Sequence, residues 1–285
     1  MDPTHNIVVA DDAQHLAQMG AELLLKTARR HVARTGRCNI AVSGGSTPRR
    51  MHRLLAQAPY ADVMPWMGLH LFWVDERLVT VDDPASNYGL ALKDFLSRVA
   101  LPQDNIHPMR AMTPPEAAAA DYQRTLERHF EIDACGGPAF DLVFLGIGTD
   151  GHTASIFPRD TTAETPTRWV VAVKGGTPDV DRLTLTYRVL NCAGKIVFLV
   201  SGAPKASIVK RILTKEEASL PPLKLHPQGG EVLWLLDREA AASHSIVVRA
   251  TSADGSTSTR GFTIAVNDLD EFDVTVPTDT DAATN

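Results

Sequence analysis

The sequence has few of the features that mark disulfide-rich, zinc-binding or membrane proteins. Its 285 residues include only three cysteines, Cys38, Cys135 and Cys192, which lie far apart and form no C-x-x-C pair. Neither a disulfide framework nor a zinc knuckle is therefore indicated, and a reducing compartment fits. No apolar run approaches the roughly 18 residues that a membrane span needs, and residues 1–6 carry an acid where a signal peptide carries a base. We expect a cytoplasmic protein with no membrane partner.

Positive charge is also scarce. The formal net charge is -6, with 28 Lys and Arg against 34 Asp and Glu. Nucleic-acid binding normally needs a basic face or stripe, so we expect no nucleic-acid partner. Hydrophobic residues make up 44% of the chain and charged residues 22%, which indicates a globular protein of one large or two ordinary domains.

Short apolar runs alternate with amphipathic stretches along most of the chain. The continuous apolar segments 142–145 and 196–200 predict strands buried on both faces, which is typical of a mostly parallel sheet. The expected strands are 6–10, 39–43, 69–74, 140–146, 169–173, 183–186, 195–201 and 231–236. The expected helices are 12–34, 48–57, 87–100, 115–131 and 204–213. We therefore predict a doubly wound, Rossmann-like α/β fold over residues 1–242, with a mostly parallel sheet flanked by helices.

In such a sheet, ligands bind beyond the carboxyl ends of the strands. The first loop at such an end reads Ser43-Gly44-Gly45-Ser46-Thr47-Pro48 and leads into a helix. Glycines let backbone N–H groups approach a phosphate, the hydroxyls add donors, and the helix N-terminus favours an anion. The alternative is an ordinary turn in which Ser46 or Thr47 caps the helix. The G-K-[ST] ending of a P-loop is absent.

The second loop begins with Asp75-Glu76-Arg77 and continues to Ser86-Asn87. Arg77 could clamp a phosphate with two parallel hydrogen bonds, while Asp75 or Glu76 holds the guanidinium or a sugar hydroxyl. A surface ion pair followed by a helix cap would explain the same residues.

The third loop, 146–152, reads Gly-Ile-Gly-Thr-Asp-Gly-His. It contains G-x-G-x-x-G, yet a dinucleotide site is disfavoured because the loop is mid-chain, Pro158 leaves little room for a long helix, and two polar side chains intrude. We predict instead a turn that presents Asp150 and His152. Histidine is suited to proton transfer near neutral pH and a neighbouring carboxylate can orient it, although a structural histidine is the alternative.

These segments resemble, in order and spacing, the signature segments of the 6-phosphogluconolactonase family. The resemblance covers roughly residues 5–242 and extends to the segments 153–158, 181–186, 201–205 and 232–237. It implies hydrolysis of 6-phosphogluconolactone to 6-phosphogluconate in the oxidative pentose phosphate pathway, without a cofactor or a metal. It also implies a small-molecule sugar-phosphate lactone as partner, and we expect a monomer or a homodimer.

The resemblance also implies roles for individual residues. His152 becomes the general base, with Asp150 beside it. The candidates for binding phosphate and sugar are Ser43, Gly44, Gly45, Thr47, Asp75, Arg77, Asn87, Arg182 and Lys205. Lys205 could alternatively be a solvated residue in the first turn of a helix.

The chemistry suits a lactone, because a ring ester needs only a base for water and donors for the oxyanion. Ser46 and Ser155 could be proposed as covalent nucleophiles, but G-x-S-x-G is missing and neither has an evident adjacent base. His152 has no second His or Cys at ligand spacing, so no metal is expected.

Two other functions compete with lactone hydrolysis. Glucosamine-6-phosphate deaminases share the D-G-H core. After it, their sequences have a stretch that resembles F-N-E-P, whereas this chain continues Ser155-Ile-Phe-Pro158. At the segment of Arg77, their sequences resemble D-E-Y. These two departures from the deaminase pattern favour the lactonase. A non-catalytic sugar-phosphate sensor is also disfavoured, because binding alone would not require Asp150 and His152.

Residues 243–285 have a different character. Polar and apolar residues alternate on either side of Ala253-Asp254-Gly255, which predicts a β-hairpin. The segment resembles the last two strands of a cadherin-like repeat. An isolated hairpin is marginally stable, so we expect docking or partial disorder, with 275–285 disordered in either case. The acidic residues beyond 266 cannot readily supply a complete calcium site.

Overall fold

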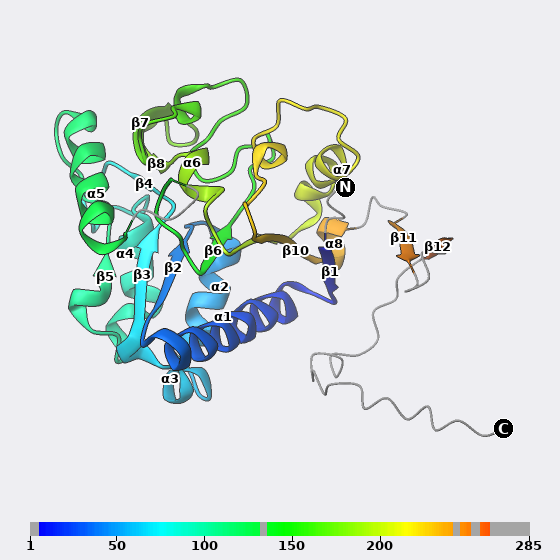
Figure 1. Ribbon diagram of the computed structural model, residues 1–285, viewed down its shortest axis with the longest axis horizontal. Coiled ribbons are helices and arrows are strands. Elements are labelled where there is room, and N and C mark those ends of the chain that lie inside the picture. The colour runs from blue at the N-terminus through cyan, green and yellow to red at the C-terminus, as the bar shows by residue number, and fades with distance from the viewer. Residues whose placement is uncertain (1–5, 132–135, 242–245, 252–256, 263–285) are drawn as a thin grey trace. The chain divides into compact units, whose positions relative to one another are not determined.

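The computed structural model describes residues 6–131, 136–241, 246–251 and 257–262 (Figure 1). The chain divides into two compact units, Met1–His244 and Ser245–Asn285. No helix within the described ranges is long and apolar enough to cross a membrane.

The first unit is built on a seven-stranded sheet in which every neighbouring pair is parallel. In sheet order the strands are β1 (Asn6–Ala10), β10 (Glu231–Asp237), β9 (Lys195–Val200), β6 (Leu142–Leu145), β2 (Cys38–Val42), β3 (Leu69–Trp73) and β5 (Ile106–His107). All four residues of β6 are buried, as its continuous apolar sequence predicts. The predicted α/β fold is confirmed.

The five predicted helices appear in order as α1 (Ala13–Thr35), α2 (Ser46–Leu55), α4 (Asn87–Asp94), α5 (Pro115–His129) and α7 (Ala206–Leu213). Three helices of four residues each are unpredicted: α3 (Tyr60–Val63), α6 (Tyr187–Leu190) and α8 (Arg238–Ala241). The Asp12 side chain accepts hydrogen bonds from two N–H groups of the first turn of α1, and Gly36 ends that helix at a φ of 78°. α1 packs on β1, β2 and β10 and also against α2.

A second sheet is antiparallel and has three strands. Its order is β4 (Asp75–Arg77), β8 (Val180–Leu185) and β7 (Val170–Gly175). The sequence predicts β7 and β8 but places Asp75–Arg77 in a loop. That placement is wrong, because this polar segment becomes a strand through its pairing with β8 and has no apolar pattern to predict it. The two-residue strand β5 is also unpredicted. α4 ends at Asp94, six residues before the predicted end.

The second unit contains an antiparallel pair, β11 (Ile246–Thr251) and β12 (Thr257–Phe262), where the sequence predicts a hairpin. The predicted turn at 253–255 and the predicted disorder at 275–285 lie outside the described residues.

The cysteines depart from expectation at one position. Cys192 is disulfide-bonded, whereas the sequence indicates no disulfide framework. Cys38 is a free and buried thiol, and burial raises its pKa strongly.

Candidate active site

A cavity of about 210 Å³ opens where β2, β6 and β9 end. This is the position at which a parallel sheet binds ligands. The predicted residues that line it are Ser43, Gly44, Gly45, Thr47, Asp75, Arg77, Asn87, His152, Arg182 and Lys205. Asp150, the remaining predicted residue, contacts His152 from outside the lining. The fold thus gathers residues that span more than half of the sequence.

His152 and Asp150 form a close pair. Nδ1 of His152 lies 2.6 Å from Oδ1 of Asp150, which also accepts the backbone N–H of His152 at 3.2 Å. Desolvation opposes ionisation of Asp150, but the charge and hydrogen bonds of His152 outweigh it, so the pKa of the carboxyl is lowered. An ionised Asp150 holds the proton of the imidazole on Nδ1 and leaves the lone pair on Nε2.

Glycines make this pair possible. A Cβ atom at Gly148 would lie 2.2 Å from Nδ1 of His152 and 2.3 Å from Oδ1 of Asp150. Gly151 has a φ of 93°, a left-handed conformation that side chains rarely adopt. The hydroxyl of Thr153 closes the turn by donating to the carbonyl of Gly146 at 2.8 Å. The glycines of this loop therefore shape a turn and not a dinucleotide site.

The loop at 43–48 ends at the start of α2. Gly45 caps the helix with a φ of 104°, and no side chain makes a capping bond, so neither Ser46 nor Thr47 serves as the cap. The hydroxyl of Ser43 donates to the carbonyl of Phe144 at 2.7 Å and is therefore occupied within the fold. The anion-binding capacity of this loop lies in its backbone N–H groups at the helix start.

Arg77 and Arg182 lie opposite each other across the β4–β8 pair. Arg182 is 3% exposed and donates to the carbonyls of Gly175 at 2.6 Å and Pro178 at 3.0 Å. Burial, and then the charge of Arg77, lower its pKa. Among the described residues neither guanidinium forms an ion pair with a carboxylate, and Nε of Arg77 is buried without a hydrogen-bond partner. Two adjacent unpaired cations form a ready site for an anion.

Asn87 connects Arg77 to the loop before α2. Its Oδ1 accepts a hydrogen bond from Arg77 at 2.7 Å, and its amide donates to the carbonyl of Asp75 at 3.0 Å. A Cβ at Gly44 would lie 1.8 Å from the same Oδ1, so only glycine allows this approach. Asn87 thus positions the guanidinium and does not depend on a ligand for its bonds.

Glu76, which the sequence offers only as an alternative to Asp75, organises this region. Its carboxylate, 2% exposed, accepts the backbone N–H groups of Arg77, Asn87 and Tyr88 at 2.7 to 2.8 Å. Desolvation outweighs these bonds and raises the pKa of Glu76 to about 7. The sequence signal is the acid between two candidate residues, but its contacts with residues ten to twelve positions away are visible only in the structure.

Ser155, considered above as a nucleophile, is fully buried. Its hydroxyl donates to Oδ2 of Asp75 at 2.7 Å, and its N–H donates to the hydroxyl of Thr184 at 3.3 Å. Asp75 therefore ties the loop that carries His152 to the antiparallel sheet. This arrangement gives Asp75 and Ser155 a structural task.

Lys205 lines the cavity at the end of a short 3-10 turn, Ala203–Lys205, directly before α7. Burial lowers its pKa, whereas the charge of Asp150 acts in the opposite direction. The preceding loop is fixed by Asp237, whose carboxylate accepts from the hydroxyl of Ser201 at 2.5 Å and from the N–H of Gly202. Lys205 is thus a half-buried cation at the pocket, and not a solvated one.

Phe157 also belongs to the site. Its ring centroid lies 5.2 Å from that of His152, and the guanidinium carbon of Arg182 lies 5.9 Å from the same ring. The side chain forms an apolar contact between the two polar residues. This places Phe157, from the Ile156-Phe157-Pro158 segment, beside the His152 imidazole.

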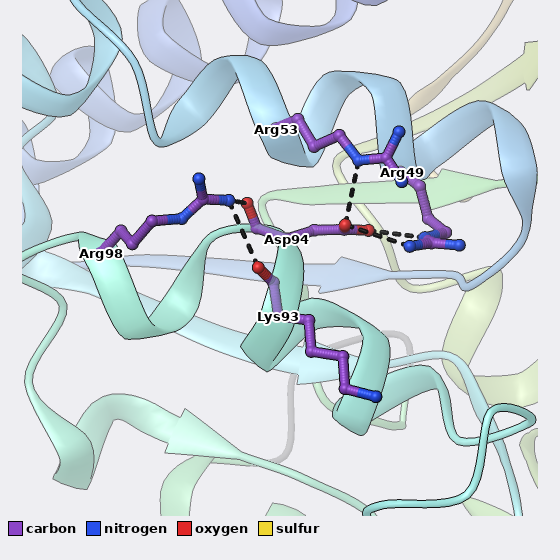
Figure 2. Close-up of polar contacts among 5 residues, drawn as sticks. All are labelled: Arg49, Arg53, Lys93, Asp94 and Arg98. Carbon is purple, nitrogen blue, oxygen red and sulfur yellow. Dashed lines mark hydrogen bonds and ion pairs between the residues drawn. The ribbon is translucent and has the colours of Figure 1, made fainter.

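Asp94 connects α2 and α4, the two helices whose first residues line the cavity (Figure 2). Its carboxylate accepts from Nε of Arg49 at 2.6 Å and from Nε of Arg53 at 3.0 Å, so α4 is tied to α2. Arg98 donates to the main-chain carbonyls of Lys93 and Asp94. α2 starts beside Gly45 and α4 starts at Asn87, so this cluster sets the spacing between the loop at 43–48 and the support of Arg77.

Residues 11–234 match the family model described as glucosamine-6-phosphate isomerases/6-phosphogluconolactonase. The chain belongs to this family.

Individual relatives agree. A 6-phosphogluconolactonase from Synechocystis sp. is 41% identical over 213 residues, which cover 73% of this chain and 85% of the relative. One from Nostoc sp. is 36% identical over 244 residues, 84% of this chain and 98% of that protein. The solved structure of 6-phosphogluconolactonase from Trypanosoma brucei superposes with a TM-score of 0.76 at 27% identity, covering 85% of this chain and 99% of that one. The predicted family is confirmed, and these relatives are hydrolases.

Proposed function

We propose that this chain hydrolyses 6-phospho-D-glucono-1,5-lactone to 6-phosphogluconate, with His152 as the general base. The observation that carries the proposal is the Asp150–His152 pair, 2.6 Å apart, at the wall of a pocket that also presents two arginines with no ion pair among the described residues. The family membership supports the substrate class.

In this mechanism Nε2 of His152 takes a proton from a water molecule that attacks the lactone carbonyl. Asp150 accepts the hydrogen bond from Nδ1 and stabilises the imidazolium that forms. The proton then passes from the imidazolium to the ring oxygen as the C–O bond breaks. No covalent intermediate is needed, which agrees with the complete burial of Ser155.

The remaining charges match the substrate. Arg77, Arg182 and Lys205, with the N–H groups at the start of α2, provide cationic and dipolar donors for the phosphate and for the developing oxyanion. A neutral sugar lactone would offer no anion to the two adjacent guanidinium groups. We infer that the phosphate is required for tight binding.

The test generates the lactone in situ with glucose-6-phosphate dehydrogenase and follows 6-phosphogluconate formation with and without the protein. We expect acceleration over spontaneous hydrolysis, and a loss of about 10² to 10⁴ in kcat for His152→Ala. His226→Ala, at an exposed histidine outside the pocket, is the matched control. Unchanged turnover in His152→Ala would remove His152 from the role of base.

Deamination of glucosamine 6-phosphate is the competing reaction within the family. Arg77 and Phe157 favour the lactonase. The deaminase sequences resemble D-E-Y, with a tyrosine, at the segment of Arg77, and they resemble F-N-E-P, with an amide and an acid, at the segment of Phe157. Ammonia release from glucosamine 6-phosphate, measured on the same preparation, decides between the two reactions.

We further propose a cytoplasmic location and a monomer or homodimer as the working form. Light scattering coupled to size-exclusion chromatography measures the molar mass in solution. A mass that fits neither a monomer nor a homodimer would contradict the proposed oligomeric state.

A further inference from the structure

Three histidines from distant parts of the chain meet at the β3–β5 edge of the sheet, away from the lactone pocket. They are His70 of β3, His107 of β5 and His129 at the end of α5. All three are half-buried, and each offers a ring nitrogen within 4.8 Å of the others. None of them lines the pocket that holds His152.

The geometry points to a binding site for a divalent transition-metal ion of the Zn²⁺ class, held by His70, His107 and His129. This inference is independent of the proposed lactonase activity. A tetrahedral ion with nitrogen ligands at about 2.0 to 2.1 Å keeps those nitrogens about 3.3 Å apart. Nδ1 of His70 and Nε2 of His107 lie 3.2 Å apart, and a movement of roughly 1.5 Å or less at His129 completes the set.

The rings are held in place before any ion binds. Phe72 stacks on His107 with centroids 4.3 Å apart and contacts His129 at 5.0 Å. Nε2 of His129 lies 2.8 Å from Oδ1 of Asn39, a contact of the kind that orients a metal-binding imidazole. Tyr122 of α5 accepts the N–H of Trp73 and bonds to the carbonyl of His107, which fixes α5 against both strands.

The chemical state of the rings agrees with this role. Burial lowers the pKa of all three imidazoles, to about 4 for His107 and His129, which favours the neutral form that carries a lone pair. Three neutral imidazoles without a carboxylate or thiolate favour Zn²⁺, Ni²⁺, Co²⁺ or Cu²⁺ over Mg²⁺ and Ca²⁺. Water would fill the fourth position, because the cluster is only half-buried.

The experiment uses the full chain, stripped with a chelator and titrated with Co²⁺ and Zn²⁺. We expect one ion per chain, Co²⁺ absorption bands typical of nitrogen ligands, and an affinity at least about tenfold weaker in His107→Phe. Phenylalanine retains the stack on Phe72 while removing the lone pair. His226→Phe, at an exposed position, is the matched control and should bind like the wild type.

A second variant tests the site without touching a ligand. Arg37 is exposed, and its charge acts on His70 and His129. Arg37→Ala should tighten metal binding by roughly two- to fivefold, because it removes a cation beside the ion. A histidine cluster that serves packing alone predicts no such gain. Absence of Co²⁺ binding to the wild type, or equal binding by His107→Phe and His226→Phe, would overturn the proposal, whatever the lactonase assay gives.

Discussion

At the scale of single residues, the Asp150–His152 pair depends on the absence of side chains as much as on their presence. Asp150 and His152 are only two positions apart, and they meet at 2.6 Å because the backbone at Gly148 carries no Cβ in the space between them. The glycines of this loop therefore allow the contact that aligns the proposed base.

Gly148→Ala should separate Asp150 from His152, since the new Cβ would lie 2.2 Å from Nδ1 of the histidine. We expect kcat to fall about 10²-fold or more, the lower range for loss of an aligned general base. Gly194→Ala, where a Cβ meets its nearest atom at an ordinary 3.4 Å, is the control. Full turnover in Gly148→Ala, with folding verified by circular dichroism, would contradict the orienting role of Asp150.

Glu76 predicts a pH dependence of stability. Its pKa is raised to about 7 in the folded chain by burial, above the value of 4.5 expected when exposed. The folded state thus binds a proton that the unfolded state has released, so this contribution is fully present below about pH 4.5 and is lost as the pH rises through 7. The change amounts to at most about 3 kcal/mol.

Glu76→Gln should remove this slope. Between pH 5 and pH 7 the free energy of unfolding should fall more in the wild type than in the variant, as measured by urea denaturation at each pH. Glu131→Gln, at an exposed position, should follow the wild type. Parallel pH curves for wild type and Glu76→Gln would show that the carboxyl does not titrate in this window.

At the scale of secondary-structure elements, the sequence predicts what apolar patterning controls. The buried strands β6 and β9 are visible as continuous apolar runs, and the loops that follow them supply Gly146–His152 and Ser201–Lys205. β4 could not be predicted in this way, because its buried residues Asp75 and Glu76 are polar and are stabilised by hydrogen bonds. Periodicity reports burial of apolar side chains and carries no information on such bonds.

Individual contacts within the site were equally out of reach of the sequence. Ser43 was predicted to bind ligand through its hydroxyl, but that group donates to a carbonyl 101 positions away. The same limit applies to His70, His107 and His129, which are spread over three elements and acquire a common position only when β3, β5 and α5 pack. Long-range hydrogen bonds and side-chain clusters are products of topology.

The α2–α4 connection through Asp94 (Figure 2) gives an element-scale prediction. Asp94→Asn leaves two arginines without their carboxylate and should cost about 1 to 2 kcal/mol in the free energy of unfolding, because the guanidinium of Arg53 is half-exposed. The loosened spacing between Gly44 and Asn87 should raise KM for the lactone more than it lowers kcat.

The control for this variant is Asp121→Asn. Asp121 pairs with Arg124 at an exposed position, so its loss should change stability by less than about 0.5 kcal/mol. If both variants lose equal stability and leave KM unchanged, α2 and α4 are positioned by their apolar contacts alone.

At the scale of the whole molecule, the chain separates into a unit that contains every predicted site residue and a unit that contains none. The first has its own core, which extends from Ala10 to Ala240. The second follows it as residues Ser245–Asn285. The resemblance of this segment to a cadherin-like repeat stays a prediction.

Removal of residues 244–285 should therefore leave kcat/KM for the lactone within about twofold of the full chain. Steady-state turnover and thermal unfolding of both forms provide the measurements. A large loss of turnover at unchanged melting temperature would mean that the second unit takes part in catalysis, and a large drop in melting temperature would mean that it supports folding.

The contact between Gly44 and Asn87 has a consequence for interpreting genomes. No side chain at all fits at the position of Gly44 while Asn87 supports Arg77, and none fits at that of Gly148 while Asp150 supports His152. A homologous gene that encodes any other amino acid at either position cannot build the site in this form. Two glycine codons thus provide a criterion for separating intact copies from decayed or repurposed ones, even where the histidine itself persists.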